Sequence, residues 1–168
     1  MKVKDHMVPL SECARVAEDR SLFDAVLMLE ACRQRFEHSE YRPRVILVYD
    51  KDFRIVGSIR QLDLLRGIAP GRVPAESSSS VPASADWAEV WANLNKSSRN
   101  IRVKDLMYRY SPEEYVTEDT PLEQAMDRLV QGPYLNLVVT ANDVSVGIFR
   151  LSDLFAMACR DIKKSGMH

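Results

Sequence analysis

Two Arg-x-x-Asp sequences carry the side chains most able to do chemistry in this chain. Arg60 stands three residues before Asp63, and Arg150 stands at the same distance before Asp153. A carboxylate accepts hydrogen bonds through two oxygens, and a guanidinium donates them in a planar fork that matches a carboxylate or a phosphate. Because the same pair occurs twice, we expect two related sites, and such pairing favours binding over catalysis.

Both pairs close the copies of an internal repeat. The opening Val-Lys-Asp-x-Met of residues 3–7 returns at residues 103–107. The closing segment, Gly57 to Asp63, returns as Gly147 to Asp153. Matching residues are 100 positions apart at the opening motif and 90 positions apart at the closing motif. The first copy therefore contains additional residues between the two motifs. The chain is therefore built from one unit used twice.

Hydrophobic spacing predicts the same elements in both copies: strand, helix, strand, strand, helix. The first helical pattern consists of Leu22, Ala25, Val26 and Leu29 in one copy and of Leu122, Ala125, Met126 and Leu129 in the other. Apolar runs at 45–49 and 135–139 predict buried strands, and polar turns after them predict hairpins with 53–59 and 144–149. The second helices are predicted from Leu62, Leu64, Leu65 and Ile68 and from Leu151, Leu154, Phe155 and Ala158.

The start of the first helix differs between copies. In the second copy Thr120 is expected to cap the helix, with Pro121 at its first position and Glu123 completing a capping box. Arg20 and Ser21, at the same place in the first copy, predict a weaker start. The additional residues of the first copy, about Ala31 to Arg42, are expected to lengthen its helix up to Pro43, because the residue before a proline disfavours helix.

A segment of different composition separates the copies. Residues 70–82 hold several Pro and Ser residues, a composition that predicts a mobile linker without a packed core. Asp86 is then expected to cap a short helix from Trp87 to Asn95. Its apolar face would carry Trp87, Val90, Trp91 and Leu94. This face either docks on its own module or anchors a partner or second subunit, since tryptophan is enriched at interfaces.

Composition narrows the class of protein. The chain has 168 residues, a net charge of -1 and a pI near 6.3, so no bulk positive charge attracts nucleic acid or anionic lipid. Its three cysteines lie far apart and indicate reduced thiols rather than a metal site. The opening residues are charged and no run of eighteen apolar residues occurs, which predicts a soluble, cytoplasmic protein without a membrane segment.

Motifs for catalysis are lacking in the sequence. No glycine-rich phosphate loop, H-E-x-x-H or G-x-S-x-G occurs, and the three histidines, His6, His38 and His168, stand in unrelated segments. We therefore expect neither an enzyme nor a metal site.

The repeated order of elements, the opening V-x-D-x-M, the proline before the middle strand and the closing G-x-x-x-x-x-D resemble the tandem cystathionine-β-synthase-type (CBS) domain pair, or Bateman module. The resemblance implies an α/β fold of two β-α-β-β-α repeats packed about a pseudo-twofold axis. It places the first repeat at 1–68, with its extended helix at about 31–42, a linker with the Trp helix at 69–100, and the second repeat at 101–168. Members of this family commonly form homodimers.

The resemblance also implies a function. Many members are regulatory sensors that bind AMP, ADP, ATP or S-adenosylmethionine in clefts between the repeats, as a regulatory ligand and not a required cofactor. The regulated protein partner is unknown. Asp63 and Asp153 stand where the family's aspartate binds the ribose hydroxyls; alternatively, each only stabilises the start of its helix.

Arg60 and Arg150 depart from the family pattern, which has Ser or Thr at this position. Such an arginine either grips the phosphate of the ligand or pairs with its neighbouring aspartate and closes the cleft. The second alternative describes a ligand-free scaffold that binds proteins.

The adenine base is expected beside the loop after the first strand and beside the middle strand. The matching residues are Val16, Ala17 and Ile46 in the first copy and Val116, Thr117 and Asn136 in the second. Backbone amides there can read the base while apolar side chains enclose it. Asn136 either contacts the ligand or is a buried amide bonded to nearby backbone. Because the copies differ here, we expect two unequal sites.

Overall fold

A computed structural model describes residues 1–37, 43, 45–69 and 86–166. The backbone forms two compact units, each with a four-stranded sheet. Unit 1 combines Met1–Ser11 with Ser111–His168, and unit 2 is Glu12–Tyr110. Residues 38–42 of the predicted helix extension and 70–85 of the predicted linker lie outside the described residues.

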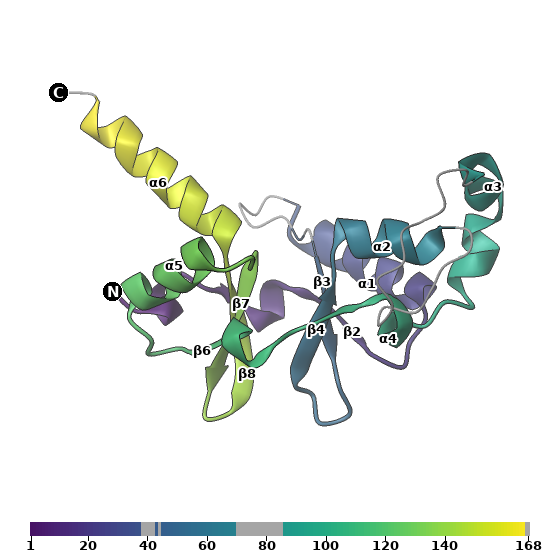
Figure 1. Cartoon of the computed structure of the whole chain (residues 1–168), viewed down its shortest axis with the longest axis horizontal. Helices are drawn as coiled ribbons and strands as arrows, with labels where there is room; N and C mark the ends of the chain where they lie inside the picture. Colours follow the sequence, from purple (N-terminus) through teal and green to yellow (C-terminus); the bar gives the residue numbers. More distant parts are fainter. Residues whose placement is uncertain (38–42, 44, 70–85, 167–168) are drawn as a thin grey trace. The chain divides into compact units, whose positions relative to one another are not determined.

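Unit 1 contains the strand, helix, strand, strand, helix order predicted for the second copy. The elements are β6 (Tyr115–Thr117), α5 (Leu122–Gln131), β7 (Asn136–Ala141), β8 (Val144–Arg150) and α6 (Leu151–Ser165), preceded by the short β1 (Val8–Pro9), a 3-10 turn η1 (Val3–Asp5) and a 3-10 turn η3 (Pro112–Glu114). Its sheet order is β1-β8-β7-β6, parallel between β6 and β7 and antiparallel elsewhere. Figure 1 shows the β7–β8 hairpin and α6 running out from the end of β8.

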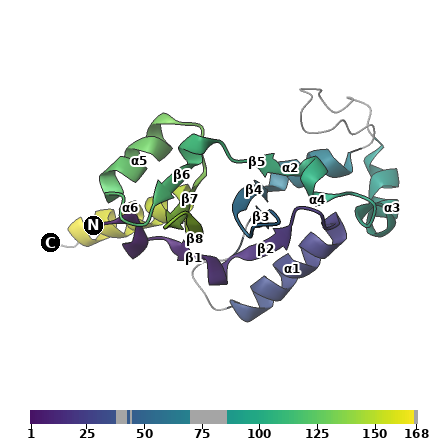
Figure 2. The ribbon, with the colours of Figure 1, turned by 90° about the horizontal axis from the view of Figure 1, so that it is seen from below.

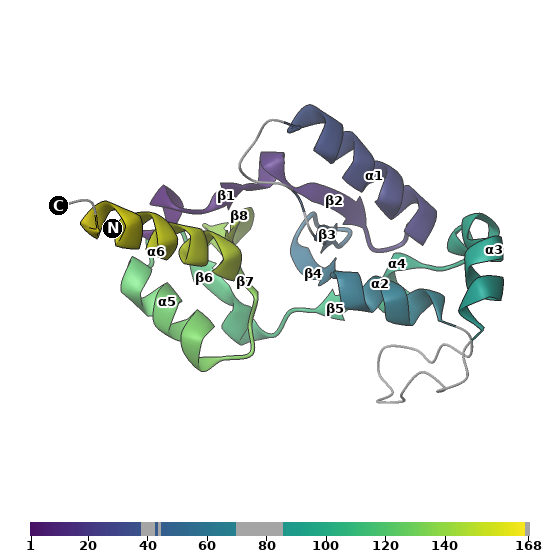
Figure 3. The ribbon, with the colours of Figure 1, turned by 90° about the horizontal axis from the view of Figure 1, so that it is seen from above.

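Unit 2 repeats the arrangement with the first copy. Its elements are β2 (Ala14–Ala17), α1 (Leu22–Arg35), β3 (Ile46–Tyr49), β4 (Ile55–Ile59) and α2 (Gln61–Ile68), followed by α3 (Trp87–Ser98), α4 (Val103–Leu106) and β5 (Tyr108–Arg109). The sheet order is β2-β3-β4-β5, parallel between β2 and β3. The helix α1 lies along β2, and α3 contacts both α1 and α2 (Figures 2 and 3). The remaining 3-10 turn, η2 (Leu10–Glu12), spans the sequence boundary between the units.

The opening segment of each copy belongs to the unit formed by the other copy. The backbone N–H of Val3 donates to Thr120 O (3.0 Å), and that of Val103 donates to Arg20 O (2.9 Å). The neighbouring Lys4 and Lys104 repeat this match, donating to Glu118 O and Glu18 O at 3.0 Å. The sequence copies and the compact units are therefore different divisions of the chain.

Each unit has its own hydrophobic core, which includes the Val and Met of an opening motif. In unit 2, Val103 and Met107 are buried with residues of α1, β2, β3 and β4. In unit 1, Val3 is buried in the core and Met7 packs against it. The repeated V-x-D-x-M is thus a packing motif that attaches each opening segment to its unit.

Two predictions about helix starts were wrong. Ser21 caps α1 with a complete capping box, its hydroxyl accepting from Asp24 N at 3.1 Å, although a weak start was expected there. In the second copy α5 begins only at Leu122 with Pro121 as its N-cap residue. The Thr120 hydroxyl bonds instead to Thr117, so this local turn takes the group that was expected to cap the helix.

The two further helix predictions have partial or full support. The helix α1 has 14 residues and α5 has 10, so α1 is longer by about one turn. The prediction that it continues up to Pro43 was wrong: α1 ends at Arg35, because the backbone of Phe36 already leaves the helical conformation. Asp86 caps α3 as predicted, accepting from Glu89 N at 3.2 Å. Val90 and Leu94 pack against the core of unit 2, while Trp87 and Trp91 are 42% and 61% exposed. The helix therefore docks on its own unit by one face and leaves both indoles partly in solvent.

Candidate functional site

Each Arg-x-x-Asp pair lies at a corner where a strand enters a helix. Arg60 follows β4 and precedes α2, and Arg150 ends β8 and precedes α6. Both arginines have extended backbone angles, so each continues its strand up to the helix. Three residues on, the aspartate lies in the first helical turn, within reach of the guanidinium. The two copies thus build the same local geometry.

In both corners the arginine and the aspartate form a bidentate ion pair. Arg60 Nε donates to Asp63 Oδ2 (2.7 Å) and its Nη2 to Oδ1 (2.8 Å). Arg150 donates in the same way to both oxygens of Asp153, at 2.7 Å each. The pairing of each arginine with its neighbouring aspartate, one of the alternatives left open by the sequence, is therefore present in the structure.

Asp63 also stabilises the start of α2. Its Oδ2 accepts the backbone N–H of Arg60 at 2.9 Å, which satisfies one of the free donors at a helix N-terminus. The side chain is only 8% exposed. The Asp63 carboxylate thus accepts three hydrogen bonds, two through Oδ2 and one through Oδ1.

An aromatic ring supports Arg60. Its guanidinium carbon lies 4.0 Å from the centroid of the Tyr108 ring, and Tyr108 packs edge-on against Tyr110 at 5.8 Å. The Asp63 hydrogen bond, partly opposed by burial, raises the pKa of Arg60 above its already high value. This side chain therefore stays a cation.

The predicted base-binding residues of unit 2 lie on adjacent parallel strands. Val16 and Ala17 are on β2, and Ile46 is on β3, where it pairs in register with Ala14. Val16 and Ile46 are 3% and 2% exposed and belong to the core. Their side chains pack inside the unit, so only their backbone groups are available to read a base.

The three predicted base-binding residues of unit 1 differ from one another in their exposure to solvent. Val116 is a core residue, Thr117 is exposed at the end of β6, and Asn136 is buried at the start of β7. Asn136 pairs in register with Arg150 on β8, which brings these two predicted residues together. The equivalent Ile46 pairs with Ile59, one residue before Arg60.

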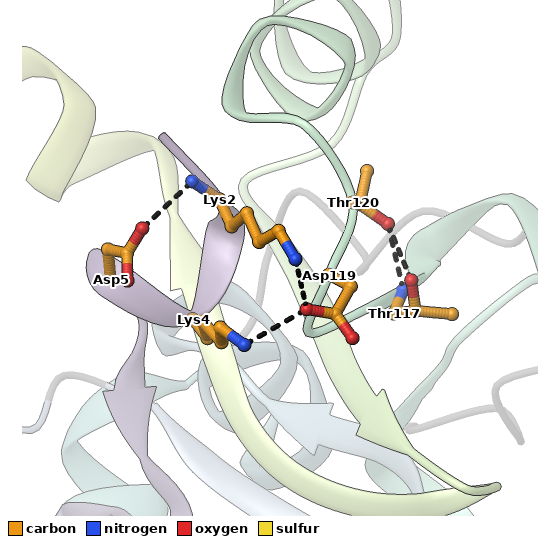
Figure 4. Close-up of polar contacts among 6 residues, drawn as sticks. All are labelled: Lys2, Lys4, Asp5, Thr117, Asp119 and Thr120. Carbon is orange, nitrogen blue, oxygen red and sulfur yellow. Dashed lines mark hydrogen bonds and ion pairs between the residues drawn. The ribbon is translucent and has the colours of Figure 1, made fainter.

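A polar cluster beside Thr117 was not among the predicted site residues (Figure 4). Lys2 Nζ and Lys4 Nζ both bind Asp119 Oδ1, at 2.7 and 3.0 Å. Hydrogen bonds from the two lysines lower the pKa of Asp119 to about 2. The cluster attaches the opening segment to unit 1, and its sequence signal was the repeated Glu-Asp at 18–19 and 118–119.

The described part of the chain offers no metal site and no membrane-spanning helix. There, no group of three His, Cys, Asp or Glu side chains is arranged to hold a metal ion. No helix of this part has the length and apolar character needed to cross a bilayer.

Comparison with known proteins places the fold. Residues 103–158 match the model of the CBS domain family. The CBS-pair protein CBSX2 from Arabidopsis thaliana is 21% identical, with 96% of each chain covered and a TM-score of 0.63. A structure of CBSX2 in complex with AMP is 22% identical over 95% of this chain and 96% of that chain, with a TM-score of 0.60.

A putative acetoin utilization protein, AcuB from Vibrio cholerae, is similar as well. It is 18% identical over 100% of this chain and 97% of that chain, with a TM-score of 0.61. No curated protein matches the chain in sequence. The predicted α/β fold with two β-α-β-β-α repeats is therefore confirmed.

Proposed function

We propose that this chain, which has the fold of CBS-pair proteins and matches the CBS domain model over residues 103–158, is a regulatory protein that binds an adenosine-containing nucleotide, such as AMP, ADP or ATP, at the Arg–Asp corner of each unit. Asp63 and Asp153 would accept the ribose hydroxyls, and Arg60 and Arg150 would donate to phosphate. The base would lie against the backbone of the adjacent parallel strands. The bound nucleotide would regulate a protein partner by favouring one conformation of the module.

The observation that carries this proposal is the same bidentate Arg–Asp ion pair at both corners. In each unit, an aspartate carboxylate and an arginine guanidinium lie where a strand of the sheet enters a helix. The same sheet contains the pair of parallel strands. A ribose phosphate offers two adjacent hydroxyl donors and an anion, which match an aspartate and an arginine. The AMP complex of CBSX2, a protein of the same fold, supports adenine nucleotides as the first ligands to test.

The Arg–Asp ion pairs can be replaced by contacts with a nucleotide. The Arg60 side chain is 31% exposed and that of Arg150 is 13% exposed, so water reaches both pairs to some degree. In such partly buried pairs, the main cost of opening is to leave one charge without a partner. A nucleotide that replaces each partner with an equivalent one would therefore bind at little cost in lost interactions.

A second candidate follows from the same contacts. Both predicted ribose-binding carboxylates are already held bidentately by arginine. If the pairs stay closed, the module is a ligand-free scaffold that binds a protein partner. The exposed faces of Trp87 and Trp91 would then be the first surface to examine.

Calorimetric titration with AMP, ADP, ATP and S-adenosylmethionine separates the two candidates. The nucleotide module should show saturable binding that is lost when Asp63→Ala and Asp153→Ala are combined. Asp63→Ala also removes a helix-capping group, so Asp24→Ala, which removes the capping box of α1, is the matched control and should bind normally. A chain that binds none of these ligands would exclude adenosine nucleotides and leave the scaffold.

The remaining predictions accompany this function. We propose a homodimer in the cytoplasm, without enzymatic activity and without nucleic-acid or membrane partners. The composition of the chain and the family resemblance support these statements. Size measurement in solution by light scattering tests the dimer directly.

A further inference from the structure

Tyr108 reaches Arg60 because the opening segment of the second copy pairs with the sheet of the first. It lies on β5, in register with Ser58 on β4, two residues before Arg60. Side chains two residues apart along extended backbone share a face of the sheet. The Tyr108 ring is thus diagonal to Arg60, and the 4.0 Å separation is that of a cation–π contact.

The corresponding position in unit 1 holds a valine. Val8 on β1 lies in register with Ile148 on β8, two residues before Arg150. An aliphatic side chain offers no π face to a guanidinium. The two corners, alike in their Arg–Asp pairs, therefore differ in the residue that the exchanged strand supplies.

We propose that Tyr108 makes Arg60 a latch on Asp63, so that the corner of unit 2 opens only to a ligand that offers Arg60 an anion; in unit 1 the exchanged strand supplies Val8 in place of this ring. This inference rests on the proposed function. Closed, Arg60 gives two N–H donors to Asp63 and its face to Tyr108. Open, the same donors go to phosphate, and the two Asp63 oxygens are released for the ribose hydroxyls.

The exchange distinguishes nucleotides from nucleosides. A nucleoside that takes Asp63 leaves the charged donors of Arg60 without an acceptor in a site where it is less than one-third exposed. Unpaired charged donors away from bulk water are costly. A nucleotide returns a bidentate acceptor and avoids that cost. The latch therefore selects ligands that carry both a diol and a phosphate.

Deprotonation of Arg60 does not operate this latch. The pKa of Arg60 is raised by its bond to Asp63, so the guanidinium stays charged. The ring of Tyr108 is in turn held edge-on by Tyr110, whose backbone N–H donates to Val56 O at 3.0 Å. A competing anion, not deprotonation of Arg60, is what opens the corner.

Calorimetry in the Asp153→Asn background, where only the unit 2 corner retains its carboxylate, tests the latch. Tyr108→Leu removes the ring and should tighten AMP binding roughly two- to thirtyfold, which is the range of a cation–π contact expressed as affinity. Tyr108→Phe keeps the ring and should bind AMP as the parent does. Arg60→Thr should weaken AMP, strengthen adenosine and so remove the preference for the nucleotide.

The outcomes separate the latch from the function on which it rests. Nucleotide binding with equal affinities in Tyr108→Leu and Tyr108→Phe, or an AMP preference unchanged by Arg60→Thr, overturns the latch and leaves the nucleotide module standing. Absence of all nucleotide binding in the unaltered chain overturns the module itself.

A measurement without ligand completes the test. By NMR, the Nε–H of Arg60 should exchange slowly with water in the parent and in Tyr108→Phe, and faster in Tyr108→Leu. Equal exchange rates in the three proteins would contradict the latch independently of any nucleotide.

Discussion

At the scale of single residues, Asp119 is the side chain whose charge depends most clearly on its neighbours. Two lysines of the opening segment hold one of its oxygens, and its pKa falls to about 2 from a usual value of about 3.9. The unfolded chain therefore takes up this proton at higher pH than the folded protein does. The contribution of Asp119 to stability is fully present above pH 4 and is lost as the pH falls through about 2.

Asp119→Asn should remove this dependence. The unaltered chain should exceed the variant in free energy of unfolding by a constant amount from about pH 5 to 8, and the difference should shrink between about pH 4 and 2. Urea unfolding at stepped pH measures it, and 1 M salt should reduce it by screening. Asp19→Asn is the matched control at the equivalent position of the first copy. The hydrogen bond from Arg102 goes to the backbone carbonyl of Asp19 at 3.4 Å, which this substitution keeps. An NMR titration midpoint for Asp119 near 4 would refute the assignment.

The sequence predicts individual residues well where the chemistry is local. Each Arg–Asp pair spans three residues, so its pairing could be named as one alternative before any fold was known. Tyr108 was not predicted beside Arg60, because strand exchange brings together residues 48 positions apart in the chain. Lys2 and Asp119 were missed for the same reason.

At the scale of elements, two glycines control the attachment of the exchanged strands. A Cβ at Gly147 would lie 2.6 Å from Val8 O and 2.8 Å from Met7 Sδ. A Cβ at Gly57 would overlap the backbone carbonyl of Tyr108. These are the first residues of the repeated G-x-x-x-x-x-D, so the glycine that marks the motif is the one that admits the neighbouring strand.

Gly57→Ala and Gly147→Ala should therefore each destabilise one unit, by about 1–3 kcal/mol, as overpacked sites usually do. Gly166→Ala is the control, because a Cβ there meets only ordinary contacts at 3.8 Å. The urea concentration at the midpoint of unfolding should be measured for the three variants and for the unaltered chain. Unchanged midpoints in both variants would mean that the exchanged strands are not closely held.

Helix termini show where pattern-based prediction fails. Thr120, Pro121 and Glu123 match the consensus of a capping box better than Ser21 and Asp24 do, yet only the second set forms one. The Thr120 hydroxyl has two local partners in competition, and the turn at Thr117 takes it. Periodicity fixed the position of both helices, while the cap depended on a contact across the preceding turn.

At the scale of the whole molecule, the repeat seen in the sequence and the folded unit are offset. Unit 2 needs residues beyond the predicted boundary at 100: its core includes Ile101, Val103, Leu106 and Met107, and its sheet ends with β5. A buried side chain of this size contributes roughly 1.5–3 kcal/mol. Four of them approach the whole stability of a small domain, about 5–15 kcal/mol.

Two fragments of nearly equal length can distinguish the two divisions of the chain. The fragment 12–110 contains all of unit 2 and should unfold cooperatively, whereas the fragment 1–100, cut at the predicted boundary, should not. Circular dichroism melting and NMR dispersion measure the cooperativity of unfolding in each fragment. The ordered elements of unit 2 that the second fragment lacks are α4 and β5. If 1–100 melted as sharply and at as high a temperature as 12–110, the opening segments would be accessory and the sequence repeat would be the folding unit. The opposite result would explain why the opening motif is repeated: each copy must supply the segment that completes the other's core.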